Sequence, residues 1–187
     1  MSFCIGTDEL SVAKIEAFRE RAKAAAIAEA LKQGFATERE GLVFREAIPN
    51  IDLGPTPAAT GYATATYTTA AVVVSTWTSV YSNAAVPQLA NNRIIVFYKI
   101  YDETPLPSIT EVRFRLGQTG TSTLGWFHIE GIINVKRTPE AWLSEPIVYM
   151  PSQWMFIECY SRLAIPAAGE KLGFGAFVCE RVGEQLS

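Results

Sequence analysis

From Leu42 onward the sequence consists of short β-rich runs separated by proline, glycine and asparagine, with no helix-length segment between them. Parallel strands need a long crossover connection, which is usually a helix. The pattern therefore excludes βαβ units and predicts antiparallel pairing. Roughly eight or nine runs occur, at a spacing of roughly 8 to 20 residues, which is typical of folds with two antiparallel sheets.

Two of the runs also indicate which of their faces are buried. Residues 111–116 alternate polar and apolar side chains, which predicts a half-buried strand, whereas residues 93–101 are apolar in both alternating sets. The second pattern predicts a central strand that is covered on both sides. The other predicted strands are 42–47, one or two within 62–81, 126–137, 146–150, 153–162 and 172–180.

These features predict a mainly β fold, an antiparallel two-sheet sandwich preceded by one N-terminal α-helix. A jelly-roll arrangement is our first choice, and an immunoglobulin-like sandwich or a closed barrel is the alternative. Thr7 is a suitable helix N-cap, and Gly34 favours a helix end near Gln33. We therefore divide the chain into a helical arm, residues 1–36, and a sandwich domain, residues 37–187.

The predicted helix has a thin apolar stripe in which alanine predominates. Alanine favours helix formation but offers little area to bury. Two placements stay open: the helix folds onto its own sandwich, or it stands off and packs against a partner. A proline-bearing segment, residues 49–62, follows the first strand and is expected to be an extended arm or loop.

The bulk properties exclude several classes of function. The 187-residue chain has a net charge of −3 and scattered Lys and Arg residues, so no basic run is available to follow a nucleic-acid backbone. The first residues lack signal-peptide features and no membrane-length apolar stretch occurs, so we expect a soluble, unprocessed chain. Cys4, Cys159 and Cys179 are widely spaced and are expected to be reduced thiols, with Cys159 in the core.

No group of residues predicts a catalytic, cofactor or metal site. The single histidine, His128, is expected on the outward face of strand 126–137, and multi-histidine metal centres need two or three imidazoles. A Cys-His pair of His128 with Cys159 or Cys179 lacks an activating context. The glycine-rich segments 117–123 and 169–175 lead into strands, so they are expected to be turn and strand glycines and not phosphate loops.

Two further sets of side chains were weighed as sites. Carboxylates for glycoside cleavage would come from Glu111, Glu130, Glu158 and Glu180, but several of these look like solvated positions. Trp77, Trp126, Trp142 and Trp154 could form a sugar-stacking platform if two or three reached the surface together. Core or subunit-interface positions are the commoner role, and the strands with two apolar faces favour an oligomer.

Two segments resemble a known family, Phe44-Arg45-Glu46-Ala47-Ile48-Pro49 and Leu143-Ser144-Glu145-Pro146-Ile147-Val148-Tyr149-Met150-Pro151. Together with the N-terminal helix, the proline-bearing connection and the run of strands, they resemble the decoration or cement proteins of tailed-phage capsids. The resemblance implies a non-enzymatic virion protein, made in the host cytoplasm, that binds neighbouring subunits of the major capsid protein, often as a homotrimer. It carries over no catalytic residue, and the helix and residues 49–62 would be its contact arms.

Two alternatives remain at this stage. A carbohydrate-binding or receptor-binding module of a fibre or spike would use exposed aromatic residues around its loops. A small lyase or isomerase on a jelly-roll scaffold would need a reactive cluster that the sequence does not contain.

Overall fold

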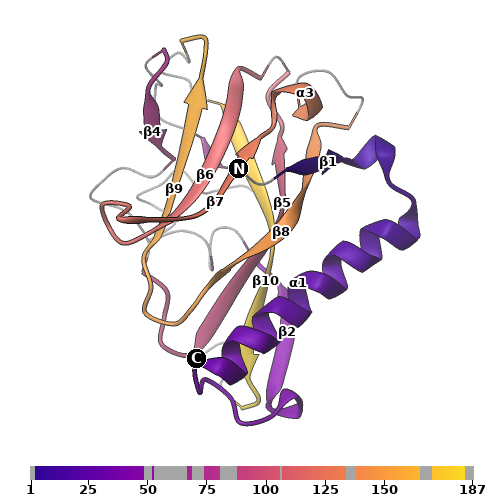
Figure 1. Ribbon diagram of the computed structural model, residues 1–187, viewed down its shortest axis with the longest axis vertical. Helices are drawn as coiled ribbons and strands as arrows, with labels where there is room; N and C mark the ends of the chain where they lie inside the picture. Colours follow the sequence, from indigo (N-terminus) through magenta and orange to yellow (C-terminus); the bar gives the residue numbers. More distant parts are fainter. Residues whose placement is uncertain are drawn as a thin grey trace.

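The computed structural model describes residues 3–48, 52, 67–68, 74–80, 88–105, 107–133, 138–164 and 170–183. Within them, two antiparallel sheets pack face to face, and a long helix lies across the outside of one sheet (Figure 1). The predicted mainly β sandwich preceded by one N-terminal helix is therefore confirmed. The predicted arm at residues 49–62 lies outside the described residues except for Asp52, so it stays a prediction.

The larger sheet has the strand order β1-β8-β5-β10-β2, and the short β3 also pairs with β10. The smaller sheet has the order β4-β9-β6-β7. All pairs are antiparallel. The strands are β1 Cys4–Gly6, β2 Leu42–Glu46, β3 Tyr67–Thr68, β4 Trp77–Ser79, β5 Arg93–Asp102, β6 Ile109–Leu116, β7 Ser122–His128, β8 Glu140–Tyr149, β9 Met155–Ser161 and β10 Lys171–Arg181.

The pairing is that of a jelly roll. Apart from the short β1 and β3, the described residues form eight strands, and these pair first with last: β2 with β10, β4 with β9, β5 with β8 and β6 with β7. The chain thus follows the path of a long double ribbon that is rolled into two four-stranded sheets, which is the jelly-roll arrangement. It differs from the strand order of an immunoglobulin-like sandwich.

The main core lies between the two sheets. Phe97 of β5 meets Phe114 of β6 and Phe174 of β10, with ring centroids 5.2 and 5.6 Å apart, and all three side chains are buried. The opposite face of β5 is buried too, because Ile94, Val96 and Tyr98 pack under the helix. The predicted central strand with two covered faces is confirmed.

The helix α1, Val12–Lys32, packs against its own sandwich. Ala22, Ala26 and Ala30 are fully buried against the larger sheet, from which the rings of Tyr98, Trp142 and Phe177 project into the same cluster. The small alanine side chains let the helix backbone approach these rings, so the sheet supplies most of the buried volume. The thin apolar stripe of α1 therefore packs against the sandwich of its own chain, which is the first of the two placements left open.

The helix begins later than predicted. Its N-cap is Ser11, whose hydroxyl accepts a hydrogen bond from the Lys14 N–H at 3.4 Å. The predicted cap, Thr7, starts a 3-10 turn, and its hydroxyl accepts from the Trp142 indole N–H at 2.7 Å and donates to Glu140 at 2.8 Å. A tertiary contact therefore uses the hydroxyl that we expected to cap the helix. The predicted end is confirmed, with Gly34 at φ +70° after the C-cap Gln33.

Two predicted strand boundaries are wrong. The strand predicted over 126–137 is β7, which starts earlier, at Ser122, and ends at His128, and a short helix, α3, Glu130–Ile133, follows. It ends there because the next strand, β8, belongs to the other sheet. The strand predicted from Pro146 starts at Glu140, because a register irregularity between Ile147 and Trp142 accommodates the proline inside β8.

Candidate functional site

The outer face of the smaller sheet gathers aromatic and charged side chains from four strands. Trp77 of β4 pairs with Tyr160 of β9, and Arg113 of β6 pairs with both Glu158 of β9 and Trp126 of β7. Directly opposed residues in antiparallel strands point to the same face. We call this group the aromatic–arginine cluster, comprising Trp77, Trp126, Tyr160, Arg113, Arg115 and Glu158.

The three aromatic rings of the cluster contact one another and one arginine. The Trp77 ring lies 5.6 Å from that of Trp126, nearly perpendicular at 80°, and 5.4 Å from that of Tyr160. The guanidinium carbon of Arg113 lies 4.0 Å from the centroid of the Trp77 ring, which is a cation-π contact. All of these side chains are half-buried.

Ion pairs fix the cluster in position. Arg113 Nε donates to Glu158 Oε2 at 2.6 Å, and Arg115 Nη1 donates to the same oxygen at 3.1 Å. The Trp126 indole N–H donates to Glu111 at 2.6 Å, and the other oxygen of Glu111 lies 3.3 Å from His128 Nε2. These contacts leave a prearranged surface of rings and arginine that is suited to binding and contains no activated nucleophile.

The structure separates the four tryptophans. Trp77 and Trp126 meet in the aromatic–arginine cluster. Trp142 is buried under α1, and Trp154 packs against the inter-sheet core. The sequence singled out the right residue type but could not show which two indoles meet, because that depends on the register of β4, β9, β6 and β7.

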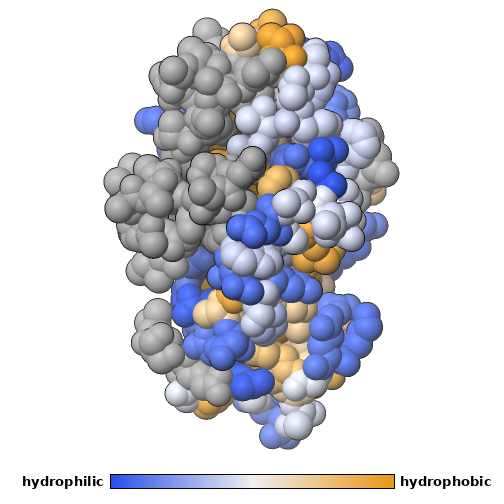
Figure 2. Space-filling model, turned by 90° about the vertical axis from the view of Figure 1, so that its left-hand side faces the viewer, coloured by the Kyte–Doolittle hydropathy of each residue, from blue (hydrophilic) through white to orange (hydrophobic). Residues whose placement is uncertain are grey.

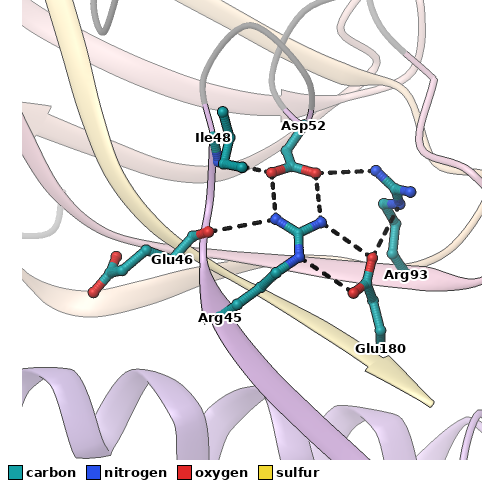
Figure 3. Close-up of polar contacts among 6 residues, drawn as sticks. All are labelled: Arg45, Glu46, Ile48, Asp52, Arg93 and Glu180. Carbon is teal, nitrogen blue, oxygen red and sulfur yellow. Dashed lines mark hydrogen bonds and ion pairs between the residues drawn. The ribbon is translucent and has the colours of Figure 1, made fainter. Parts of the chain in front are cut away.

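A second charged group lies at the end of the inter-sheet space where β5 begins (Figure 3). Arg45 of β2 donates through both terminal nitrogens to Asp52, at 2.6 and 2.8 Å, and also donates to Glu180 of β10 at 3.2 and 3.3 Å. Arg93 of β5 donates at 3.0 Å to Asp52 Oδ1, an oxygen that also accepts from Arg45, and approaches Glu180. Two cations and two anions thus form a neutral group, here called the four-charge cluster.

The four-charge cluster is structural. The side chain of Asp52 is fully buried and that of Glu180 is 2% exposed, so both carboxylates depend on the arginines for charge compensation. The hydrogen bond to Asp52 is the main cause that raises the pKa of Arg45 above its ordinary value, so the guanidinium stays charged. Asp52 Oδ2 also accepts from the Ile48 N–H at 2.7 Å, which ties Asp52 to the residues that follow β2.

The expectation that several carboxylates are solvated is wrong for three of the four. Glu158 and Glu180 are buried and each contacts two arginines, and the side chain of Glu111 is only 14% exposed. Glu130 is the most exposed and pairs with Arg162. The signal that sequence reasoning missed is cross-strand: each buried glutamate faces an arginine of a neighbouring strand.

Cys159, Cys179 and the His128 side chain lie in separate environments, while the Cys4 thiol donates to the backbone carbonyl of His128 at 2.9 Å. Cys159 is in the inter-sheet core as predicted, Cys179 lies under α1, and His128 points outward with 42% of its side chain exposed. All three cysteines are free, and burial raises the pKa of each thiol to about 12. Among the residues that the structure describes, no three His, Cys, Asp or Glu side chains converge as a metal site.

The surface is mixed in character. The side of the molecule on which β4 and β9 lie has small apolar areas separated by polar ones across its described part (Figure 2). A groove of about 650 Å³ lies between α1 and β2, lined by apolar Ile27, Leu31 and Phe44 and by charged residues. Within the described part of the chain, no helix is long and apolar enough to cross a membrane.

Comparison with known proteins does not place the chain in a family. A scan against protein-family models gave no match, and a search of curated proteins found none with significant sequence similarity.

Proposed function

We propose that this chain is a structural protein of a phage virion that decorates or cements the capsid by binding neighbouring subunits of the shell. The observation that carries the proposal is the aromatic–arginine cluster. Trp, Tyr and Arg are the side chains that most often dominate protein interfaces, especially when they are held in place before binding. The cluster presents all three on one sheet face.

The arrangement of the larger sheet also favours the smaller sheet as the partner surface. Its outer face is occupied by α1, whose buried alanines and neighbouring rings form a second core. The smaller sheet is therefore the better candidate for the partner surface, in preference to the helix. Jelly-roll domains are common in virus particles, although the same architecture also serves lectins and enzymes, so the fold alone carries no function.

The test is binding to shells. Virions would be purified on a density gradient and probed with an antibody against the chain. Shells from which the chain has been removed would then be incubated with recombinant protein. We expect the chain to co-sediment with the shells and Trp77→Ala to weaken binding at least tenfold. Phe3→Ala is the matched control, because Phe3 is 66% exposed and lies outside the cluster.

Oligomeric state is measured on the same samples. A homotrimer by light scattering agrees with the proposal. Failure of the chain to co-sediment with virions or to rebind stripped shells overturns it. Deleting residues 1–36 is a poor test, because it would remove β1 and uncover the buried rings of Tyr98, Trp142 and Phe177.

A carbohydrate-binding module is the second candidate, favoured by the meeting of Trp77, Trp126 and Tyr160. Against it, the rings are tilted or perpendicular to one another, and Arg113 occupies one face of Trp77. A sugar platform needs an accessible ring face. Glycan-array binding that Trp77→Ala abolishes, without binding to shells, would favour this candidate.

A further inference from the structure

The two ends of β5 carry opposite arrangements of charge. Arg93 begins the strand inside the four-charge cluster, where arginines compensate both carboxylates. Asp102 ends the strand. The charged group that interacts with its carboxyl group is a second acid, Glu170, which immediately precedes β10. Asp102 is 1% exposed and Glu170 3%. Two carboxyl groups are therefore buried together at this end of the sandwich.

Asp102 organises the turn that leaves β5. Its Oδ1 accepts a hydrogen bond from the Thr104 N–H at 2.7 Å, and the Thr104 hydroxyl accepts in turn from the Lys171 N–H at 2.8 Å. The carboxyl group of Asp102 is thus connected, through one residue, to the first residue of β10.

Glu170 holds the start of β6. One of its oxygens accepts from the Ser108 N–H at 2.5 Å and the other from the Ile109 N–H at 3.2 Å. The pair therefore fastens both ends of the β5–β6 connection to the beginning of β10 through backbone hydrogen bonds. These strands belong to different sheets, so the contact joins the two layers at this end.

Within the part of the chain that the structure describes, arginines face the carboxylates of the four-charge cluster, whereas the charged group that acts on Asp102 is another acid, Glu170. With both groups ionised, no donor among the described residues reaches the buried Asp102 Oδ2. From β9 the Cys159 thiol faces the two acids and stays neutral, while Glu103 and Lys171, on the adjoining segments, are exposed. A single proton on the pair removes one negative charge and supplies the missing donor, since the two acids then share a hydrogen bond.

We propose that Asp102 and Glu170 form a proton-operated latch, which fastens the β5–β6 connection to β10 when the pair holds a proton and loosens it when both carboxylates ionise. Desolvation by burial is the main cause that raises the pKa of Asp102 to about 7, with Glu170 adding to it. An exposed aspartate has a pKa near 3.9. The closed latch therefore binds more protons than the open one between about pH 4 and pH 7, so closure weakens as pH rises through that window and levels off above it.

Hydrogen exchange with mass-spectrometric detection, corrected for intrinsic rates, tests the latch on the full chain in EDTA at pH 5 and pH 8. We expect protection of peptides covering residues 103–109 and 170–172 to fall at least tenfold at pH 8. Peptides covering residues 177–181, whose Glu180 faces two arginines, serve as the internal control and should keep their protection.

Asp102→Asn is the matched variant, because an amide keeps the acceptor for Thr104 and donates a hydrogen bond at every pH. Its latch peptides should show equal protection at pH 5 and pH 8. Wild-type protection that is unchanged between the two pH values overturns the proposal, as does the same loss in Asp102→Asn. If that variant fails to fold, the carbon-13 NMR titration of the wild-type Asp102 carboxyl decides: a midpoint below pH 5 overturns the latch.

Discussion

Arg113 stacks on the indole ring of Trp77 and, through Nε, donates a hydrogen bond to Glu158 at 2.6 Å. One side chain thus joins the aromatic and the ionic parts of the cluster. Arginine suits this role because its planar group can stack and donate at the same time.

The first prediction concerns this residue. Arg113→Ala should lower the free energy of unfolding by about 2 kcal/mol, because it removes a cation-π contact and a charge-assisted hydrogen bond together. Urea unfolding followed by tryptophan fluorescence measures the change. Arg115→Ala is the control. Arg115 also bonds Glu158 but lies over no aromatic ring of the described residues, so a loss as large as that of Arg113→Ala would contradict the role given to stacking.

The second prediction concerns the four-charge cluster. Asp52→Ala should destabilise the protein by about 3–5 kcal/mol, because Arg45 and Arg93 would then share one carboxylate in a buried site. Thermal and urea unfolding provide the measurement. Glu16→Ala removes an exposed partner of Arg19 at 3.8 Å and should change stability by less than about 0.5 kcal/mol. Similar losses of stability in the two variants would mean that Asp52 does not compensate the charge of the buried arginines.

The third prediction concerns the packing of α1. Ala26→Leu should cost about 1–3 kcal/mol, because the extra carbons have no space between the helix and the rings of Tyr98 and Trp142. The same change at the exposed Ala17 should cost less than about 0.5 kcal/mol. The comparison is made by urea unfolding, and equal tolerance at both positions would mean that the helix does not pack closely in solution.

The fourth prediction concerns the pH dependence of global stability. The pKa of Asp102 is raised to about 7, so the folded state binds more protons than the unfolded state between about pH 4 and pH 7. This residue therefore lowers the free energy of unfolding as pH rises through that range, with no further loss above it. Asp102→Asn should remove the slope and be more stable than the wild type at pH 8, by on the order of 2 kcal/mol.

Urea unfolding at pH 5, 6, 7 and 8 gives the two curves. Parallel curves for wild type and variant would assign the pH dependence to other groups. A variant that is less stable than the wild type at pH 8 would show that the ionised Asp102 is compensated in the folded protein.

The sequence predicted those features that depend on local pattern. The two-sided burial of β5 follows from its apolar residues in both alternating sets, and the end of α1 follows from Gly34. The start of the helix and the end of β7 were wrong for the same reason: Thr7 is used by Trp142, and β7 must stop where the chain crosses to the other sheet. Neither constraint is visible in neighbouring residues.

The aromatic–arginine cluster and the latch could not be predicted, because both depend on long-range register. Trp77 and Arg113 are brought together only through β9, which lies between their strands. Glu158 and Glu180 looked like solvated residues because their arginine partners are on other strands. The residue types could be read from the sequence, but which of them come into contact depends on the strand pairing of the jelly roll.

The pairing of the first jelly-roll strand with the last has a consequence for synthesis on the ribosome. Arg45 and Glu180 are separated by 135 residues, yet they share hydrogen bonds in the finished molecule. While the chain is still emerging, Arg45 and Asp52 can meet but Glu180 does not yet exist, and β2 has no β10 to pair with. The nascent sandwich is therefore open along one side until β10 has left the ribosome, and during that period its apolar strands are exposed to aggregation or depend on chaperones.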